Sequence, residues 1–200
     1  MSKVINRAYE NYADAVSVIH QLEAAGISHN DISIVANNVN DDNDPTHKDA
    51  VAKGAGGGAA AGGTVGAGAG LLAGLGMLAI PGVGPVVAAG WLIAAAAGAA
   101  ASAAAGATAG GIIGKLNEYE VSDEEAHFYL EVIRRGGALV SAKVSDDDAA
   151  KTTQIMDKAQ YIDVPSRINA YRGENWTGYS ETVPVFTNEQ IAAERARYRS

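Results

Sequence analysis

The chain has 200 residues and a formal net charge of −8. This acidic balance argues against nucleic acid as the main partner, because binding to phosphates needs clustered Lys and Arg side chains. The sequence contains no Cys, which excludes disulfide bonds, thiolate metal sites and a cysteine nucleophile. A chain of this length suffices for one domain, or for a small domain that carries an insertion.

Residues 1–36 are predicted to be the first half of an α+β domain, in the order strand, helix, strand. Val4 to Tyr9 fits a short strand. Apolar side chains recur at helical spacing from Asn11 to Ala25, and Gly26 follows as a typical helix-terminating residue. Residues 32–36 alternate as expected for a short, mostly buried strand.

Residues 37–50 are an acidic connector rich in Asn and Asp. Their carboxylates are oxygen ligands of the kind that Ca²⁺ takes, but the EF-hand order, with its central Gly and terminal Glu, is missing. We therefore expect a solvated loop, with weak calcium binding as the alternative. The aspartates concerned are Asp41, Asp42, Asp44 and Asp49.

Residues 51–116 are predicted to form an antiparallel helical hairpin rich in Gly and Ala. No charged residue lies between Lys53 and Lys115. The sequence Pro-Gly-Val-Gly-Pro at 81–85 cannot continue a helix, so it is the predicted turn between the two arms. The residues expected to form this turn are Pro81, Gly82, Gly84 and Pro85.

Small residues recur at every fourth position in both arms. A four-residue step stays almost on one face of a helix, and a stripe of glycines lets two helix backbones pack closely. We therefore expect the arms to pack on each other and the chain to self-associate. The predicted helix-packing residues are Gly58, Gly62, Gly66, Gly70 and Gly74 in the first arm, and Gly90, Gly98, Gly106 and Gly110 in the second.

The bulky apolar side chains of the hairpin gather near its turn. Each arm would be roughly 40 Å long as a helix, which exceeds the ~30 Å hydrocarbon core of a bilayer. Membrane insertion, by spanning or by dipping, is the first hypothesis; a soluble assembly of packed helices and a flexible linker are the alternatives. The candidates for the membrane tip are Leu71, Leu72, Leu75, Leu78, Ile80, Val86, Val87, Trp91, Leu92 and Ile93.

The flanks of the hairpin predict its orientation. Lysines stand at both of its bases, and the stretch from Met1 to Tyr12 has no apolar signal region. Both features favour a membrane-associated protein with both termini in the cytoplasm. A cytoplasmic soluble assembly is the alternative location.

Residues 117–170 are predicted to be the second half of the domain, in the order helix, strand, helix, strand. Ser122 and Glu125 form a capping box for a helix through Arg135. A strand at 138–144, a helix at 145–160 and a last strand at 162–164, closed by Pro165, follow. The predicted fold is thus a ferredoxin-like, split βαβ domain with the Gly/Ala-rich antiparallel helical hairpin inserted between its halves.

Residues 171–200 are a polar C-terminal tail that contains Trp176 and ends in a short helix. Thr187 and Gln190 form a capping box for this helix. Two interpretations stay open: a flexible tail with a frayed helix, and an arm that docks on a neighbouring subunit through its aromatic side chains.

Several of these features occur together in a known family. They are the glycine-striped arm, the turn at 81–85 followed by Val-Val-Ala-Ala-Gly, the Glu-Glu-Ala of 124–126 with Tyr129, and Gly-Gly-Ala-Leu-Val at 136–140. In this order they resemble bacterial general-stress and low-temperature-induced proteins, over about residues 3–165. The resemblance implies a small bacterial protein induced by cold, heat, osmotic or desiccation stress, and it brings no established catalytic residues. The tail from Trp176 to Ser200 lies outside the pattern.

The sequence offers no motif for catalysis or for a cofactor. The four histidines, His20, His29, His47 and His127, lack metal-ligand spacing, so each is expected to be a surface or hydrogen-bonded side chain. Neither a phosphate-binding glycine loop nor a GxSxG serine motif is present. We therefore expect no enzyme, no cofactor and no metal.

The sequence thus predicts a non-enzymatic stress-response protein that inserts its hairpin into a bilayer and forms homo-oligomers. The alternative is a soluble homo-oligomeric shell or filament, whose hairpins pack between subunits. The expected partners are lipid and further copies of the chain, with no nucleic acid and no small-molecule substrate identified.

Overall fold

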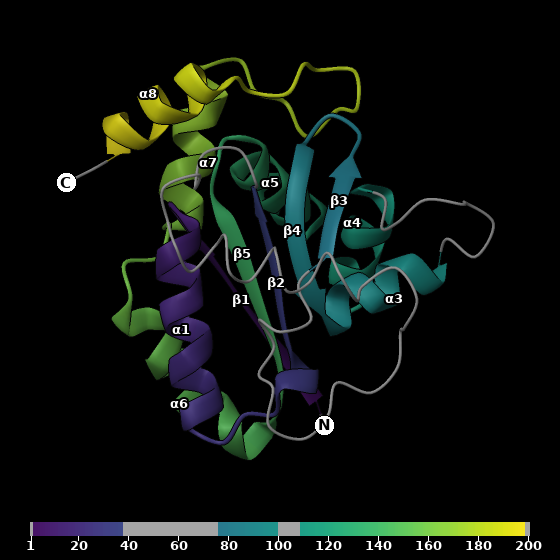
Figure 1. Ribbon diagram of the computed structural model, residues 1–200, viewed down its shortest axis with the longest axis vertical. Coiled ribbons are helices and arrows are strands. Elements are labelled where there is room, and N and C mark those ends of the chain that lie inside the picture. Colours follow the sequence, from purple (N-terminus) through teal and green to yellow (C-terminus); the bar gives the residue numbers. More distant parts are fainter. Residues whose placement is uncertain (1, 38–75, 100–108, 199–200) are drawn as a thin grey trace.

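A five-stranded antiparallel sheet forms the centre of the described part of the chain (Figure 1). The computed structural model describes residues 2–37, 76–99 and 109–198. The strands lie in the order β1 (Ser2–Tyr9), β5 (Ala138–Ser145), β2 (Ile32–Asn37), β4 (Gly84–Gly90) and β3 (Gly76–Ile80). β1 and β2 both run antiparallel to β5, so they are parallel to each other. The α+β class is confirmed.

Helices cover both faces of this sheet. The helices α1 (Tyr12–Ala24) and α6 (Asp146–Lys158) pack on one face, and α3 (Trp91–Ala99), α4 (Ala109–Asn117) and α5 (Asp123–Arg134) pack on the other (Figure 1). β2 is buried along its whole length. Successive side chains of a strand point to opposite faces, so Ile34 joins the α1–α6 core while Val35 joins the α3–α5 core.

The local signals for helix starts are confirmed in the structure. The Asn11 side chain accepts the Asp14 N–H at 2.9 Å and caps α1. Ser122 and Ser145 cap α5 and α6 in the same way. These side chains satisfy backbone donors that the first helical turn leaves without partners. The predicted helices at 11–25, 122–135 and 145–160 therefore form close to their expected bounds.

The segments on either side of the turn at 81–83 are strands, which corrects the predicted helical arms there. β3 and β4 form an antiparallel hairpin, and β4 also pairs with β2. The β-branched pair Val86 and Val87 favours a strand, and the edge of β2 supplies its pairing partner. Gly90 has φ +95°, and a Cβ there would lie 2.1 Å from the Ile32 carbonyl oxygen. Gly90 is therefore a strand-to-helix corner and not a helix-packing position.

The predicted last strand at 162–164 is wrong. Tyr161 forms an isolated bridge with Tyr9. The Asp163 side chain then accepts the Ser166 N–H at 3.1 Å and caps α7 (Val164–Gly173). Pro165 lies in the first turn of α7, where its missing N–H is tolerated. The sequence Asp-Val-Pro-Ser is thus a helix start, and the ferredoxin-like arrangement is not confirmed.

The C-terminal tail packs on its own chain, which neither expected interpretation described. The predicted capping box is present: Thr187 N–H donates to Gln190 Oε1 at 2.9 Å, and Gln190 N–H to Thr187 Oγ1 at 3.3 Å. It begins α8 (Asn188–Tyr198). Ile191 of α8 is fully buried against Gly136, where a Cβ would lie 2.3 Å from the Ile191 side chain.

Candidate functional site

Residues 174–187, which we call the strap, link α7 to α8 and cross α5 and the β3–β4 turn. Arg134 Nη1 of α5 donates to the Pro184 carbonyl oxygen at 3.0 Å. The Tyr179 hydroxyl donates to the Pro81 carbonyl oxygen. A Cβ at Gly82, which has φ +70°, would lie 2.6 Å from the Ser180 carbonyl oxygen. The strap and the turn therefore lie in direct backbone contact.

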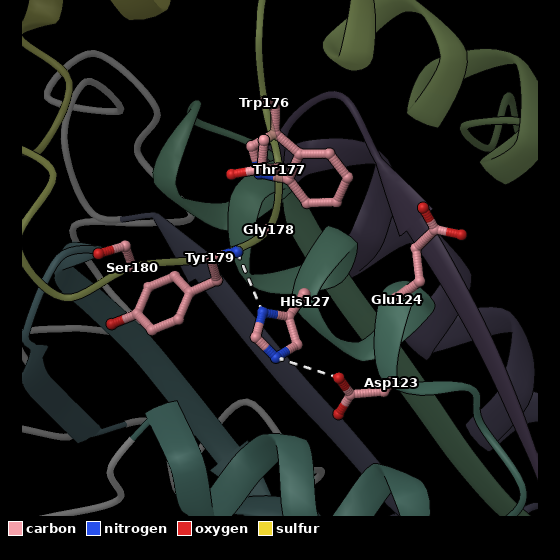
Figure 2. Close-up of a pocket in the computed structure, with 8 residues that line it drawn as sticks. All are labelled: Asp123, Glu124, His127, Trp176, Thr177, Gly178, Tyr179 and Ser180. Atoms are coloured by element: carbon pink, nitrogen blue, oxygen red, sulfur yellow. Dashed lines mark hydrogen bonds and ion pairs between the residues drawn. The ribbon is translucent and has the colours of Figure 1, made fainter.

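A polar pocket of about 290 Å³ lies between the strap and the first turns of α5 (Figure 2). The strap contributes the residues from Trp176 to Ser180, and α5 contributes Asp123, Glu124 and His127. Figure 2 shows the His127 ring between the strap backbone and Asp123. Its Nδ1 accepts the Tyr179 N–H at 3.0 Å, and its Nε2 lies 3.6 Å from Asp123 Oδ2.

This geometry assigns the tautomer of neutral His127. A nitrogen that accepts an N–H carries no proton, so the proton of the neutral ring lies on Nε2 and faces the Asp123 carboxylate. Both ring nitrogens thus have a partner. The Tyr179 hydroxyl stays protonated and remains a hydrogen-bond donor to the Pro81 carbonyl, because burial, together with the charge of Glu181, raises the pKa of Tyr179 to about 12.

A buried ion cluster anchors the strap at its beginning. Arg135, which directly follows α5, donates to Glu131 of that helix at 2.6 Å, to Glu174 of the strap at 2.6 Å and to Glu194 of α8 at 3.1 Å. The Arg135 guanidinium also lies 3.8 Å from the centre of the Tyr171 ring. Burial alone would lower the pKa of Arg135, but the hydrogen bonds to Glu174 and Glu131 raise it well above its ordinary value. The cluster therefore stays charged.

A second pocket, of about 580 Å³, lies where the N-termini of α1 and α7 meet α8. Two basic side chains line this pocket. Arg167 forms an ion pair with Glu10 and lies 3.4 Å from the centre of the Tyr198 ring, and Arg195 donates to the Gly136 carbonyl oxygen at 2.6 Å.

The structure places the predicted membrane-tip residues in the interior where it describes them. Ile80, Val86, Val87 and Leu92 are at most 1% exposed and belong to the two cores. Two more, Trp91 and Ile93, are partly buried against the α3–α5 core. Leu78 lies in β3, and its side chain is outside the described part, as are Leu71, Leu72 and Leu75.

Of the predicted helix-packing residues, Gly90, Gly98 and Gly110 lie in the described part of the chain. Gly98 lies in α3 and Gly110 in α4. Gly110 is exposed, and no described atom lies within 4 Å of the position that its Cβ would take. The other expected packing positions, Gly58, Gly62, Gly66, Gly70, Gly74 and Gly106, lie outside the described residues.

None of the helices in the described ranges combines the length and the apolar character that crossing a bilayer requires.

Among the described residues, no group of three or more His, Asp or Glu side chains is arranged to hold a metal ion. The acidic connector at 37–50 lies outside this part of the chain except for Asn37, whose amide donates to the Ile133 carbonyl oxygen at 2.9 Å.

Sequence reasoning missed the strap and its anchor. The spacing of Glu131 and Arg135, four residues apart on one helix, was a visible signal for an ion pair. Their partners Glu174 and Glu194 follow Arg135 by 39 and 59 residues, and no local pattern joins them to α5.

The first part of the chain matches a known family. The model of the heat induced stress protein YflT domain matches residues 5–83, which include most of β1, all of α1, β2 and β3, and the β3–β4 turn. Comparisons with curated proteins and with solved structures give no significant match. The match covers less than half of the chain, so it shows that this part is similar to a heat induced stress protein domain, and it supports the resemblance to bacterial general-stress proteins.

Proposed function

We propose that this chain is a non-enzymatic stress-response protein that self-associates through its Gly/Ala-rich segment, with the α+β fold as the scaffold that carries this segment. The observation that carries the proposal is the small-residue face of α4. Gly110 and Gly114 lie four residues apart, both are exposed, and no described atom lies within 4 Å of the Cβ that either would carry.

At other positions of the fold, close contacts within the chain leave no room for a side chain and so require glycine. A Cβ at Gly90 or Gly136 would lie within 2.3 Å of a neighbouring atom, and one at Gly137 would lie 2.5 Å from Val132. Gly110 and Gly114 have no such neighbour in the described part, and glycine weakens a helix by about 1 kcal/mol relative to alanine. A close helix–helix contact with another copy would offset that cost.

The apolar side chains beside the turn at 81–83 are buried within the chain, so the turn is not the surface that we propose for self-association. Ile80, Val86 and Leu92 fill the cores of the chain, so they are not a free apolar tip. We therefore assign the proposed self-association to α4 and to the uncharged residues 54–75.

Sedimentation velocity of the full chain without detergent tests this proposal. We expect the parent to sediment as a homo-oligomer and the double variant Gly110→Leu, Gly114→Leu to sediment as smaller species. Leucine is a better helix former than glycine, so the monomer should keep its fold. The matched control is Gly173→Leu, which also lies at a helical glycine with an open Cβ position. A double variant that sediments like the parent would contradict the proposal.

Membrane association is the second candidate, because residues 54–75 carry no charge and include Leu71, Leu72 and Leu75. In this case the segment inserts from the cytoplasmic side and both termini remain there. Flotation with vesicles, followed by a carbonate wash, separates the two candidates. Retention on the vesicles that Gly66→Leu abolishes would support insertion, whereas recovery of the parent in the unbound fraction would contradict it.

A further inference from the structure

We propose that His127 makes the strap a proton-sensitive latch, in which protonation of Nδ1 releases residues 176–183 from the β3–β4 turn. The inference concerns the fold of the single chain and does not rest on self-association or on membrane binding.

The latch depends on one hydrogen bond whose acceptor can be titrated. His127 Nδ1 accepts the backbone N–H of Tyr179 at 3.0 Å (Figure 2). An imidazolium carries protons on both nitrogens and accepts nothing. Protonation of His127 therefore turns the acceptor into a donor that faces the Tyr179 N–H, and the two groups repel each other. Histidine is the side chain that ordinarily changes its charge between pH 5 and 8.

The other charged groups around the ring do not replace this acceptor. On α5, Asp123 faces Nε2, on the opposite side of the ring from Tyr179. Asp123 is also held by the Asn117 amide of α4 at 3.2 Å. Glu124 forms an ion pair with Arg172 of α7. Asp123 lies on the far side of the ring, so it cannot accept the Tyr179 N–H.

The remaining neighbours lie on the strap and on the turn. Glu181 follows Tyr179 by two residues, and Arg134 lies farther along α5, where it pairs with Glu131 at 2.5 Å. The turn itself, from Pro81 to Val83, has no titratable side chain. Because the pKa of Tyr179 is raised, its hydroxyl does not lose its proton in the range where histidine titrates. His127 is thus the group in this contact that loses its capacity to accept a hydrogen bond when it is protonated.

The contact between strap and turn is local, and the hydrogen bond to His127 lies beside it. It includes the Tyr179 hydroxyl on the Pro81 carbonyl and the close approach of Ser180 and Glu181 to Gly82, and the Tyr179 side chain also packs on the α3–α5 core. These contacts come from Tyr179 itself and from the two residues after it. The ends of the strap are held separately, by Arg135 on Glu174 and by Arg134 on the Pro184 carbonyl. Release is therefore confined to the middle of the strap, and it uncovers the turn while α8 stays docked.

Hydrogen exchange of the full chain, compared at about pH 7.5 and about pH 5, tests the latch. After correction for the intrinsic pH dependence of exchange, we expect the protection of the Tyr179 amide to fall about tenfold or more at the lower pH, as expected for the loss of one hydrogen bond. Amides of β5 and α1 should keep their protection. Equal protection of the strap at both pH values would overturn the proposal, as would a simultaneous loss throughout the core.

Two variants at His127 separate the latch from a general effect of acid. In His127→Asn, the side-chain oxygen stands near the place of Nδ1 and accepts at every pH, so the strap should stay protected at both values. His127→Phe keeps the ring but has no acceptor, so the strap should exchange fast at both. His20→Asn, at an exposed site on α1, is the matched control and should behave like the parent. A His127→Asn chain that keeps the pH response of the parent would refute the latch.

Discussion

The two faces of the sheet are closed in different ways. The face under α1 and α6, which we call the apolar face, is a core of apolar side chains such as Ile19, Leu22 and Met156. The face under α3, α4 and α5, which we call the strapped face, also has an apolar core. Its helix α5, however, is also held by the strap and α8 through the charged groups Glu131 and Arg135, which are 1% and 7% exposed. Hydrophobic burial holds the helices on the apolar face, whereas buried ion pairs also hold the strap and α8 on the strapped face.

This difference predicts where single substitutions cost most. Apolar burial is non-directional and spread over many contacts, so one truncation leaves the rest of the core in place. A buried ion pair works through a few groups, and removing one partner leaves a buried charge without compensation.

The largest effect is expected for Arg135→Met on the strapped face. The change leaves Glu194 without its nearest cation and Glu131 with Arg134 alone, and breaking a buried ion pair typically costs about 3 to 5 kcal/mol. Urea unfolding measures the loss, and limited proteolysis should show α8 released first. Arg172→Met is the control, because Arg172 pairs with Glu124 at the surface, where the expected loss is about 0 to 1 kcal/mol. Equal losses of stability in Arg135→Met and Arg172→Met would contradict the view that buried ion pairs hold the strapped face.

On the apolar face, Leu22→Ala should cost about 3 kcal/mol through the lost burial and the cavity that remains. Leu22 of α1 is fully buried. The free energy of unfolding should fall while limited proteolysis still finds α8 docked, because the ion cluster lies on the other face. The exposed His20 on the same helix supplies the control: His20→Ala should change stability by less than about 0.5 kcal/mol. Early release of α8 in Leu22→Ala would show that the two faces unfold as one.

A smaller effect, about 1 to 3 kcal/mol, is expected for Gly82→Ala at the contact between turn and strap. Its positive φ disfavours a side chain, and the added Cβ would meet the Ser180 carbonyl oxygen at 2.6 Å. Hydrogen exchange of the strap should rise with the loss in stability. Gly173→Ala provides the comparison, since its Cβ position is open and a helical alanine should be neutral or stabilising. A strap that stays protected in Gly82→Ala would mean that the contact adjusts without cost.

The sequence predicted the apolar face better than the strapped face. The helices at 11–25 and 145–160 start with side-chain caps and carry apolar residues at helical spacing, and these signals lie within the segment itself. The strands at 76–80 and 84–90 were missed, because a strand forms only where a partner edge exists. That edge is β2, which lies more than forty residues earlier in the sequence than β4. The fourfold spacing of glycine indicated helix packing, whereas Gly90 serves the close approach of β4 to β2.

The candidate site was less predictable than the fold. The charged pattern of Glu131, Arg134 and Arg135 is equally typical of a solvated helix face. It becomes a buried cluster because the strap and α8 return over α5 with Glu174 and Glu194. The role of His127 depends in the same way on the backbone of Tyr179, which carries no sequence signal. The strapped face therefore depends on contacts between polar groups that lie far apart in the sequence. The periodicity of the sequence does not reveal such contacts.

The smallest effect is a dependence of the strap anchor on pH. Burial would raise the pKa of Glu174, but the hydrogen bond from Arg135 and the charges of Arg135 and Arg197 outweigh it, so the pKa lies below its ordinary value of 4.5. A carboxyl whose pKa is lowered in the folded protein contributes stability that is fully present above its unfolded pKa. This contribution is lost as the pH falls below 4.5 and through the lowered pKa of the folded protein.

Glu174→Gln isolates this contribution. The variant should be less stable than the parent at neutral pH, and the difference should shrink as the pH falls below about 4.5, because the parent then loses the charge that the variant lacks. Urea unfolding at several pH values measures the difference. Glu118→Gln is a suitable control, since Glu118 is 62% exposed and pairs with Lys115 at the surface of α4. A difference between Glu174→Gln and the parent that stays constant across this range would place the contribution of Glu174 in packing and not in charge. Packing would then hold the strap on the strapped face, as hydrophobic burial holds the helices on the apolar face.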